Sequence, residues 1–137
     1  MSGYNKFIVG CKNNDLEPIN IFFELNYEKY QWGIGSDLDM GFYIAWNNHS
    51  SNVIKRLFEL DHHKCIQLEF INGGFVNACY KGYIDVINIY IELDYDKYID
   101  LISLNEGFQG ACANNHPDIL KLLFEIDNNR RMIKQKN

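Results

Sequence analysis

The amino-acid sequence predicts an all-α fold, a solenoid of about four helix–turn–helix repeats with irregular connections between them. The first observation is a block of about twenty residues that recurs four times, led by phenylalanines spaced 35, 33 and 33 residues apart. Self-similarity at this period is typical of arrays that stack one supersecondary unit several times. The second observation is that the apolar residues within each block recur at helical spacing. The leading residues of the four blocks are Phe7, Phe42, Phe75 and Phe108.

The third block shows the unit most clearly. Apolar residues at Phe75, Ala78 and Cys79 predict a short helix over 75–81, which Gly82 ends. Residues 84–93 predict a second, longer helix whose apolar residues cover more than half of its circumference, as expected of a helix packed between neighbours. About fourteen connecting residues follow. We expect one domain over 1–137, with repeats at approximately 4–38, 39–71, 72–104 and 105–129 and a charged tail at 130–137.

The turn between the two helices of each unit has a consistent chemistry. The residue at which the first helix stops is of a type that tolerates left-handed backbone, with glycine best and asparagine next. Both prolines of the chain, Pro18 and Pro117, fall at the start of a second helix, where a missing N–H costs nothing. Acidic or asparagine residues lie close by and favour the positive end of the helix dipole. The four stop residues are Asn14, His49, Gly82 and Asn115.

Composition narrows the class of protein. The net charge of −5 argues against general binding to nucleic acid or to an anionic membrane surface. No apolar run approaches the roughly 18 residues of a membrane span, and residues 1–6 do not resemble a secretion signal. Three of the four cysteines, Cys11, Cys79 and Cys112, share one repeat position, which favours buried free thiols over disulfides. We therefore expect a cytoplasmic protein.

The block resembles the ankyrin repeat, whose unit is about 33 residues long. The third copy follows that family's pattern in register, with Tyr83 in the place of its histidine, and the fourth copy has the histidine itself. The resemblance covers roughly residues 4–128. The matching residues of the third copy are Phe75, Ala78, Gly82, Asp85, Val86, Ile87, Tyr90 and Ile91. Those of the fourth copy are Phe108, Ala111, His116, Asp118, Ile119, Leu120, Leu122 and Leu123.

Two features depart from the family's pattern. The Thr-Pro-Leu-His turn is replaced by Met40-Gly-Phe-Tyr43 and its equivalents at 73–76 and 106–109. The connecting segments lack the Gly-Ala-Asp-Val-Asn motif, so we expect an irregular loop or an extra helical turn there instead of a β-hairpin. In both respects the chain resembles the divergent ankyrin arrays of giant DNA viruses of amoebae, for which the host cytoplasm would be the place of action.

The resemblance implies a non-catalytic protein–protein interaction module that binds a protein partner through the concave face of the array. In the family, the exposed ends of the first helices and the tips of the connections line that face. Exposed tryptophan is also favoured as an interface anchor. The alternative interpretation is that these polar residues are solvated and have no partner. The candidate partner-binding residues are Asp39, Asn47, Asn48, Asn72, Tyr80, Lys81, Asn105, Asn114 and Trp32.

Tyrosines in the connections have two interpretations as well. Tyr27, Tyr30, Tyr95 and Tyr98 are either further interface anchors or residues that pack locally to hold a long connection in place. We favour local packing for these four, and regard Trp32 as the best exception.

Two rival functions stay open at this stage. The first is an oligomerising or adaptor subunit of a larger assembly, for example one that recruits targets for degradation. The second is an enzyme with a site on the connecting segments, which would need converging titratable groups with shifted pKa values. We expect no cofactor and no metal, because the run from His62 to Cys65 matches no established zinc pattern.

The two ends of the array differ in polarity. A stacked array must cover its terminal repeats with polar residues. Gln109 and Gly110 follow the last leading phenylalanine, whereas Ile8 and Val9 follow the first. The sequence therefore predicts a capped C-terminal repeat and a less covered N-terminal repeat, with self-association through the N-terminal repeat as a hypothesis.

Overall fold

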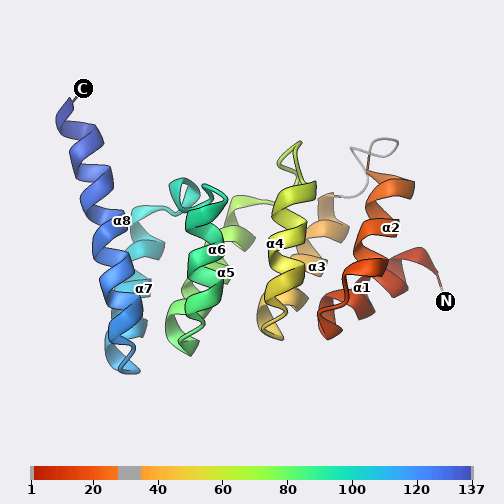
Figure 1. Ribbon diagram of the computed structural model, residues 1–137, viewed down its shortest axis with the longest axis horizontal. Helices are drawn as coiled ribbons and strands as arrows, with labels where there is room; N and C mark the ends of the chain where they lie inside the picture. Colours follow the sequence, from red (N-terminus) through yellow and green to blue (C-terminus); the bar gives the residue numbers. More distant parts are fainter. Residues whose placement is uncertain (1, 28–34, 137) are drawn as a thin grey trace. The chain divides into compact units, whose positions relative to one another are not determined.

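The computed structural model describes residues 2–27 and 35–136, and this part of the chain is all-helical (Figure 1). The predicted all-α class is confirmed, because the described residues form eight α-helices and one short 3-10 helix and contain no strand. None of these helices is both long and apolar enough to cross a bilayer. The elements are α1 (Gly3–Asn13), α2 (Leu16–Asn26), α3 (Gly35–Asn47), α4 (Ser51–Leu60), α5 (Leu68–Lys81), α6 (Ile84–Glu92), η1 (Asp96–Tyr98), α7 (Leu101–Ala113) and α8 (Pro117–Lys136).

The chain divides into two compact units, Met1–Gly74 and Phe75–Asn137. In the first unit, α1 packs on α3 and α2 packs on α4, so first helices lie against first helices and second against second. In the second unit, α7 packs on α8 and α6 packs on α8. The boundary falls inside α5, and the expectation of one domain over the whole chain stays a prediction.

All four first helices end in the same backbone turn, as the turn chemistry predicts. The residues with left-handed backbone are Asn14, His49, Gly82 and Asn115, with φ of 58°, 55°, 80° and 59°. In each turn the next residue donates its N–H to the carbonyl five residues earlier, at 2.8–3.0 Å. This bond satisfies a carbonyl that the helix end would leave unpaired. The four bonds run from Asp15 to Gly10, Ser50 to Ala45, Tyr83 to Ala78 and His116 to Ala111.

The first helices are longer than the sequence predicts. From the second repeat block on, the first helices begin at Gly35, Leu68 and Leu101, seven residues before the leading phenylalanines. The glycine–phenylalanine pairs therefore lie inside helices and not in turns, and the predicted repeat boundaries at 39, 72 and 105 each fall four residues into a helix. The connections shrink accordingly: residues 61–67 and 93–100 replace the expected fourteen. The connection before α7 contains the helical turn η1, in agreement with one of the two expected forms.

Close approach between helices explains those internal glycines. In α3, a Cβ added at Gly41 would overlap the ring of Phe7 and lie 3.1 Å from the Sγ atom of Cys11. In α7, a Cβ added at Gly107 would lie 3.0 Å from the Sγ atom of Cys79. Phe7, Cys11 and Cys79 are fully buried. At Gly41 and Gly107, the glycine before the leading phenylalanine thus lets one first helix lie directly on the aromatic ring and thiol of the helix before it.

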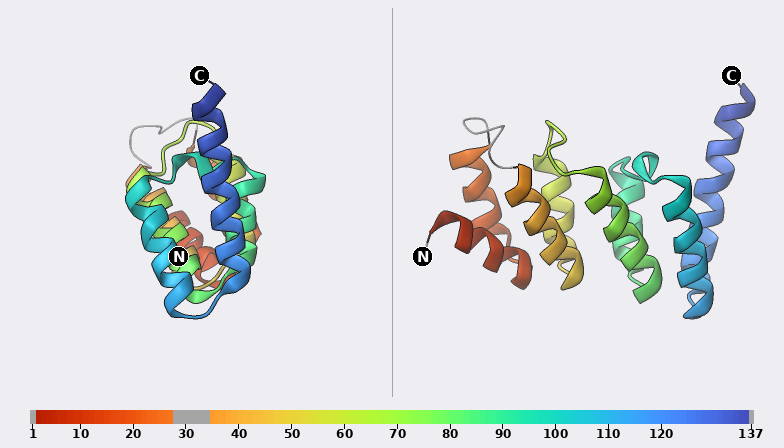
Figure 2. Two further views of the ribbon diagram at one scale, coloured as in Figure 1. Left: turned by 90° about the vertical axis from the view of Figure 1, so that its left-hand side faces the viewer. Right: turned by 180° about the vertical axis from the view of Figure 1, so that it is seen from behind.

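The second helices begin as predicted, but the last one continues further. Pro18 and Pro117 both lie in a first turn, and Pro117 opens α8. The predicted charged tail at 130–137 is wrong as a separate segment, because α8 runs without interruption to Lys136 and extends well past the start of α7 (Figure 2). The Arg130 guanidinium donates to the carbonyls of Asp96 and Ile99 at 2.7 and 2.6 Å. These bonds tie α8 to η1 and explain why the helix continues.

A buried carboxylate organises the connection after α4. The Tyr27 hydroxyl donates to Asp61 at 2.7 Å, and the backbone N–H groups of Cys65 and Ile66 donate to the same carboxylate at 2.9 Å. Tyr27, Asp61 and Ile66 are almost fully buried. Burial, together with the bond to Asp61, raises the pKa of Tyr27 well above its usual range. The expectation that Tyr27 packs locally and holds the connection is therefore confirmed.

Candidate interaction surfaces

The ends of the first helices form an exposed surface in both units. Asn47 and Asn48 lie at the end of α3, Tyr80 and Lys81 at the end of α5, and Asn114 beside the end of α7; all five side chains are exposed. Lys12, Asn13 and Ala113, at the equivalent ends, are exposed too. The predicted exposure of the helix ends is thus confirmed.

Tyr80 links two of these ends within the second unit. A Cβ added at Gly110 would lie 2.5 Å from Cδ2 of the Tyr80 ring, so the ring lies directly on the backbone of α7. The Tyr80 side chain is still 44 % exposed. Tyr80, Lys81 and Asn114 consequently belong to one continuous surface of this unit, with an aromatic ring held in place by its own neighbour.

Two of the candidate partner-binding residues are buried, and their expected exposure is wrong. Asp39 is 5 % exposed and Asn72 is 7 % exposed. The Asp39 carboxylate accepts the backbone N–H of Gln67 at 2.8 Å, just before α5 begins. The Asn72 amide donates to the carbonyl of Leu68 at 2.8 Å. Both side chains are therefore engaged with backbone groups inside the fold and are not available to a partner.

The remaining candidate residues and the other tyrosines of the connections differ in their exposure. Asn105, at the equivalent position of α7, is exposed. Trp32 and Tyr30 lie outside the residues that the structure describes. Tyr95 is buried, and its ring centroid lies 5.5 Å from that of Tyr98, which is consistent with the expected local packing.

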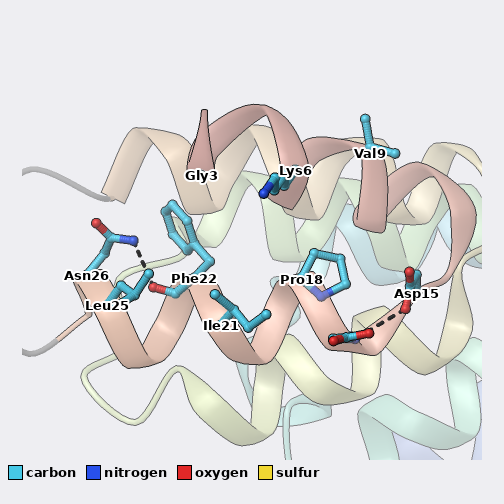
Figure 3. Close-up of a pocket in the computed structure, with 10 residues that line it drawn as sticks. Gly3, Lys6, Val9, Asp15, Pro18, Ile21, Phe22, Leu25 and Asn26 are labelled. Atoms are coloured by element: carbon cyan, nitrogen blue, oxygen red, sulfur yellow. Dashed lines mark hydrogen bonds between the residues drawn. The ribbon is translucent and has the colours of Figure 1, made fainter. Parts of the chain in front are cut away.

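A pocket of about 380 Å³ lies between α1 and α2 (Figure 3). Its floor is Phe22, which is buried, and its walls are the exposed apolar side chains of Val9, Ile21 and Leu25. Lys6 stands on the rim. The N-terminal repeat thus exposes an apolar hollow, although its leading Phe7 is fully buried.

The chemistry of the pocket favours an apolar occupant. Asp15 accepts the N–H of Glu17 at 3.2 Å and caps α2, and Asn26 donates to the carbonyl of Phe22 at 2.9 Å (Figure 3). These polar groups are thus engaged in helix structure. The pocket therefore offers apolar contact area with one cation, Lys6, at its edge.

The predicted cap on the C-terminal repeat is wrong. Phe108 is half-buried and Cys112 and Phe124 are exposed, although the leading phenylalanines and the thiols of the earlier blocks are fully buried. Together with Leu120 they line a shallow groove of about 570 Å³, which we call the C-terminal face. Of the two residues on which the prediction relied, Gln109 lines this groove, whereas Gly110 lies under the Tyr80 ring.

The cysteines divide by burial. Burial raises the pKa of Cys11 and of Cys79 to about 12, so both stay protonated and unreactive near neutral pH, as expected for core thiols. Cys112 is exposed, and its predicted burial is wrong because its place on α7 belongs to the C-terminal face. Cys65, in the connection after α4, is half-buried.

The histidines after α4 pack on the Tyr27 ring. The ring centroid of His63 lies 5.1 Å from that of Tyr27 in a stacked arrangement, and His62 lies 4.4 Å from His63. Among residues 2–27 and 35–136, no group of three His, Cys, Asp or Glu side chains is placed to hold a metal ion.

Comparison of the chain with protein-family models, with curated proteins and with solved structures found no match.

Proposed function

We propose that this chain is a non-catalytic protein-interaction module, a cytoplasmic solenoid of four ankyrin-like repeats that binds a protein partner through the ends of its first helices. The observation that carries the proposal is a contrast between positions within the repeat. The leading residue is phenylalanine in every block and the residue three after it is glycine or alanine, whereas the exposed residue five after it is of a different type in each block: Lys12, Asn47, Tyr80 and Ala113. A repeat scaffold with a surface tailored to one partner has this property.

Polar bonds between successive hairpins support the repeat interpretation. The Ser50 hydroxyl donates to the carbonyl of Lys12 at 3.2 Å. The His116 Nε2 donates to the carbonyl of Tyr80 at 3.0 Å. Ser50 and His116 occupy the same repeat position, as do Lys12 and Tyr80, so two different side chains make one equivalent bond. The first helix is longer than the resemblance to ankyrin repeats implies, which makes this array a variant of that pattern.

The exposed helix ends suit a protein partner. In the second unit they combine the Asn114 amide, which donates and accepts hydrogen bonds, with the fixed Tyr80 ring and the Lys81 cation. The surface that Tyr80 and Lys81 form is rigid, because Tyr80 lies on Gly110 and both residues are in the last turn of α5. Little conformational entropy would be lost when a partner binds there.

The test compares two variants with the same change in charge. Asn47→Glu with Asn48→Glu alters the end of α3, and Asn52→Glu with Asn88→Glu alters exposed positions on two second helices. Each protein is checked by circular dichroism and then used for affinity capture with quantitative mass spectrometry. We expect the first variant to lose at least tenfold of the specifically captured partner and the second to retain it. Equal capture by both variants would refute binding through the helix ends.

A further inference from the structure

Steric contacts define how one hairpin is seated on the next inside each unit. Gly41 meets Phe7 and Cys11 in the first unit, and Gly107 meets Cys79 in the second. In both places the incoming first helix presents a glycine to an aromatic ring and a thiol. Any side chain at the glycine would separate the two helices, because the residues beneath it are fully buried.

Polar contacts complete this packing site for the incoming hairpin, which we call the seat. The donor at the start of the incoming second helix, Ser50 or His116, reaches the carbonyl of the residue near the end of the preceding first helix. The amide oxygen of Asn14 accepts the backbone N–H of Val53, in the first turn of α4, at 3.1 Å. The hairpin of α3 and α4 therefore finds, in Asn14, an acceptor for one of the free N–H groups at the start of α4.

A further acceptor lies next to the helix start. The Asp39 carboxylate accepts the N–H of Gln67 immediately before α5 begins. The residues that form a seat thus stand at fixed repeat positions, namely the leading phenylalanine, the thiol position, the turn asparagine and the residue three before the phenylalanine.

The C-terminal face has polar or apolar groups suited to packing at all four of these positions, which no single earlier block combines. Phe108, Cys112, Asn115 and Asn105 occupy them in the last block, with the Asn105 amide in the place of the Asp39 carboxylate. Phe108 is half-buried, and Cys112, Asn105 and Asn115 are exposed. Phe124, whose equivalents Phe23 and Phe58 are buried, is 58 % exposed. Asn115 has the left-handed backbone of Asn14, with φ of 59° against 58°.

The N-terminal hairpin of a second copy does not fit this seat. Lys6 stands where the incoming helix needs glycine, and its placement there would press a charged side chain against Phe108 and Cys112. Asp15 stands where a donor is needed, and its carboxylate, which already caps α2, is an acceptor facing a carbonyl. These two residues disfavour head-to-tail stacking, which would otherwise give open filaments.

We propose that the C-terminal face docks a helical hairpin of another protein, whose first helix presents glycine at the point of closest approach and whose second helix begins with a hydroxyl or imidazole donor. Lys6 and Asp15 keep the chain's own N-terminal hairpin out of this seat. This face adjoins the last helix end, because Ala113 lines its groove. The two inferences are tested at different residues, Asn47 and Asn48 for the helix ends and Phe124 and Cys112 for this face, so either can fail without the other.

A variant of the same chain serves as the probe. Lys6→Gly and Asp15→Ser supply the missing glycine and donor, while Phe124→Glu blocks the probe's own C-terminal face and prevents polymers. The probe is mixed with the wild-type chain and measured by sedimentation velocity and titration calorimetry. We expect a 1:1 complex of twice the 16.1 kDa chain mass. Restoring Lys6 in the probe should weaken the binding at least tenfold.

Matched variants of the wild-type partner test the location. Phe124→Glu in that partner should abolish the complex, and Cys112→Arg serves as a second block of the same face. Leu25→Glu, an equally drastic change at a side chain that is 65 % exposed at the N-terminal pocket, should leave binding unchanged. Circular dichroism establishes that each variant is folded.

Three results would overturn the inference. One is that the folded probe and the wild-type chain stay separate even when both are at 100 times the concentration used for calorimetry. Another is that the complex survives Phe124→Glu in the wild-type partner. The third is that the wild-type chain associates with itself and Phe124→Glu abolishes this, which would make a second copy the occupant.

Discussion

Replacing Gly41 by alanine tests the packing of α3 on α1. The added methyl group would overlap the Phe7 ring and lie 3.1 Å from the Sγ atom of Cys11. Neither neighbour has room to retreat, since both are fully buried. The helix must therefore shift or the ring must leave its favoured rotamer, and both responses raise the free energy of the folded state.

The chain offers a matched control at Gly73, inside α5. A Cβ there would lie 3.6 Å from Cζ2 of Trp46, an ordinary van der Waals distance. Alanine is favoured over glycine in a helix interior by about 1 kcal/mol. Gly73→Ala should therefore raise the free energy of unfolding by up to about 1 kcal/mol.

The same gain offsets part of the cost at Gly41. Overpacking a rigid core costs about 1–3 kcal/mol, and we take the upper half of that range because the overlap involves a fully buried ring. After the helix-propensity gain of about 1 kcal/mol, Gly41→Ala should lower the free energy of unfolding by about 1–2 kcal/mol. The two variants should then differ by about 2–3 kcal/mol.

Urea denaturation followed by circular dichroism measures both variants against the wild-type chain. If Gly41→Ala proved as stable as Gly73→Ala, the close contact between α1 and α3 would be refuted. The explanation given for the glycines before the later leading phenylalanines would then be refuted as well.

Three further predictions concern buried polar groups. Tyr27→Phe removes a donor to the buried Asp61 carboxylate and should lower the free energy of unfolding in urea by about 1–3 kcal/mol; an unchanged midpoint would contradict the network. Iodoacetamide should label Cys112 first, whereas Cys11, whose pKa is raised to about 12, should gain no labelling rate between pH 7 and 9, as peptide mass spectrometry would show. Burial raises the pKa of Asp39, so protonation favours the folded state, and the wild-type chain should gain stability relative to Asp39→Asn as the pH falls from 7 toward the ordinary pKa of an aspartate; the opposite trend in urea melts would refute this.

The turn geometry could be predicted from the sequence because it is a local property. Asn14, His49, Gly82 and Asn115 were identified by residue type alone, and each has positive φ. The steric preference for left-handed backbone acts within one residue and does not depend on distant parts of the chain. The start of each second helix was predictable for the same reason, since Pro117 is compatible with a first turn on its own.

The length of the first helices could not be predicted in this way. Gly41 and Gly107 inside an apolar segment were interpreted as a turn, because glycine is the weakest ordinary helix former. In the structure their value lies in the absence of a side chain where another helix lies close by. The burial of Asp39 could not be predicted either, since it depends on the connection after α4, where Gln67 donates its N–H to the Asp39 carboxylate.

By itself, the sequence determined the helical class, the four-fold recurrence and the backbone turn of every hairpin, since these follow from spacing and from single-residue preferences. Tertiary structure alone decided which side of a first helix meets the next one. It therefore decided that Phe108 and Cys112 stay open at the C-terminal end, although the same residue types are buried elsewhere. The physical reason is that burial is a property of neighbours: identical side chains are core or surface according to whether another helix lies on them.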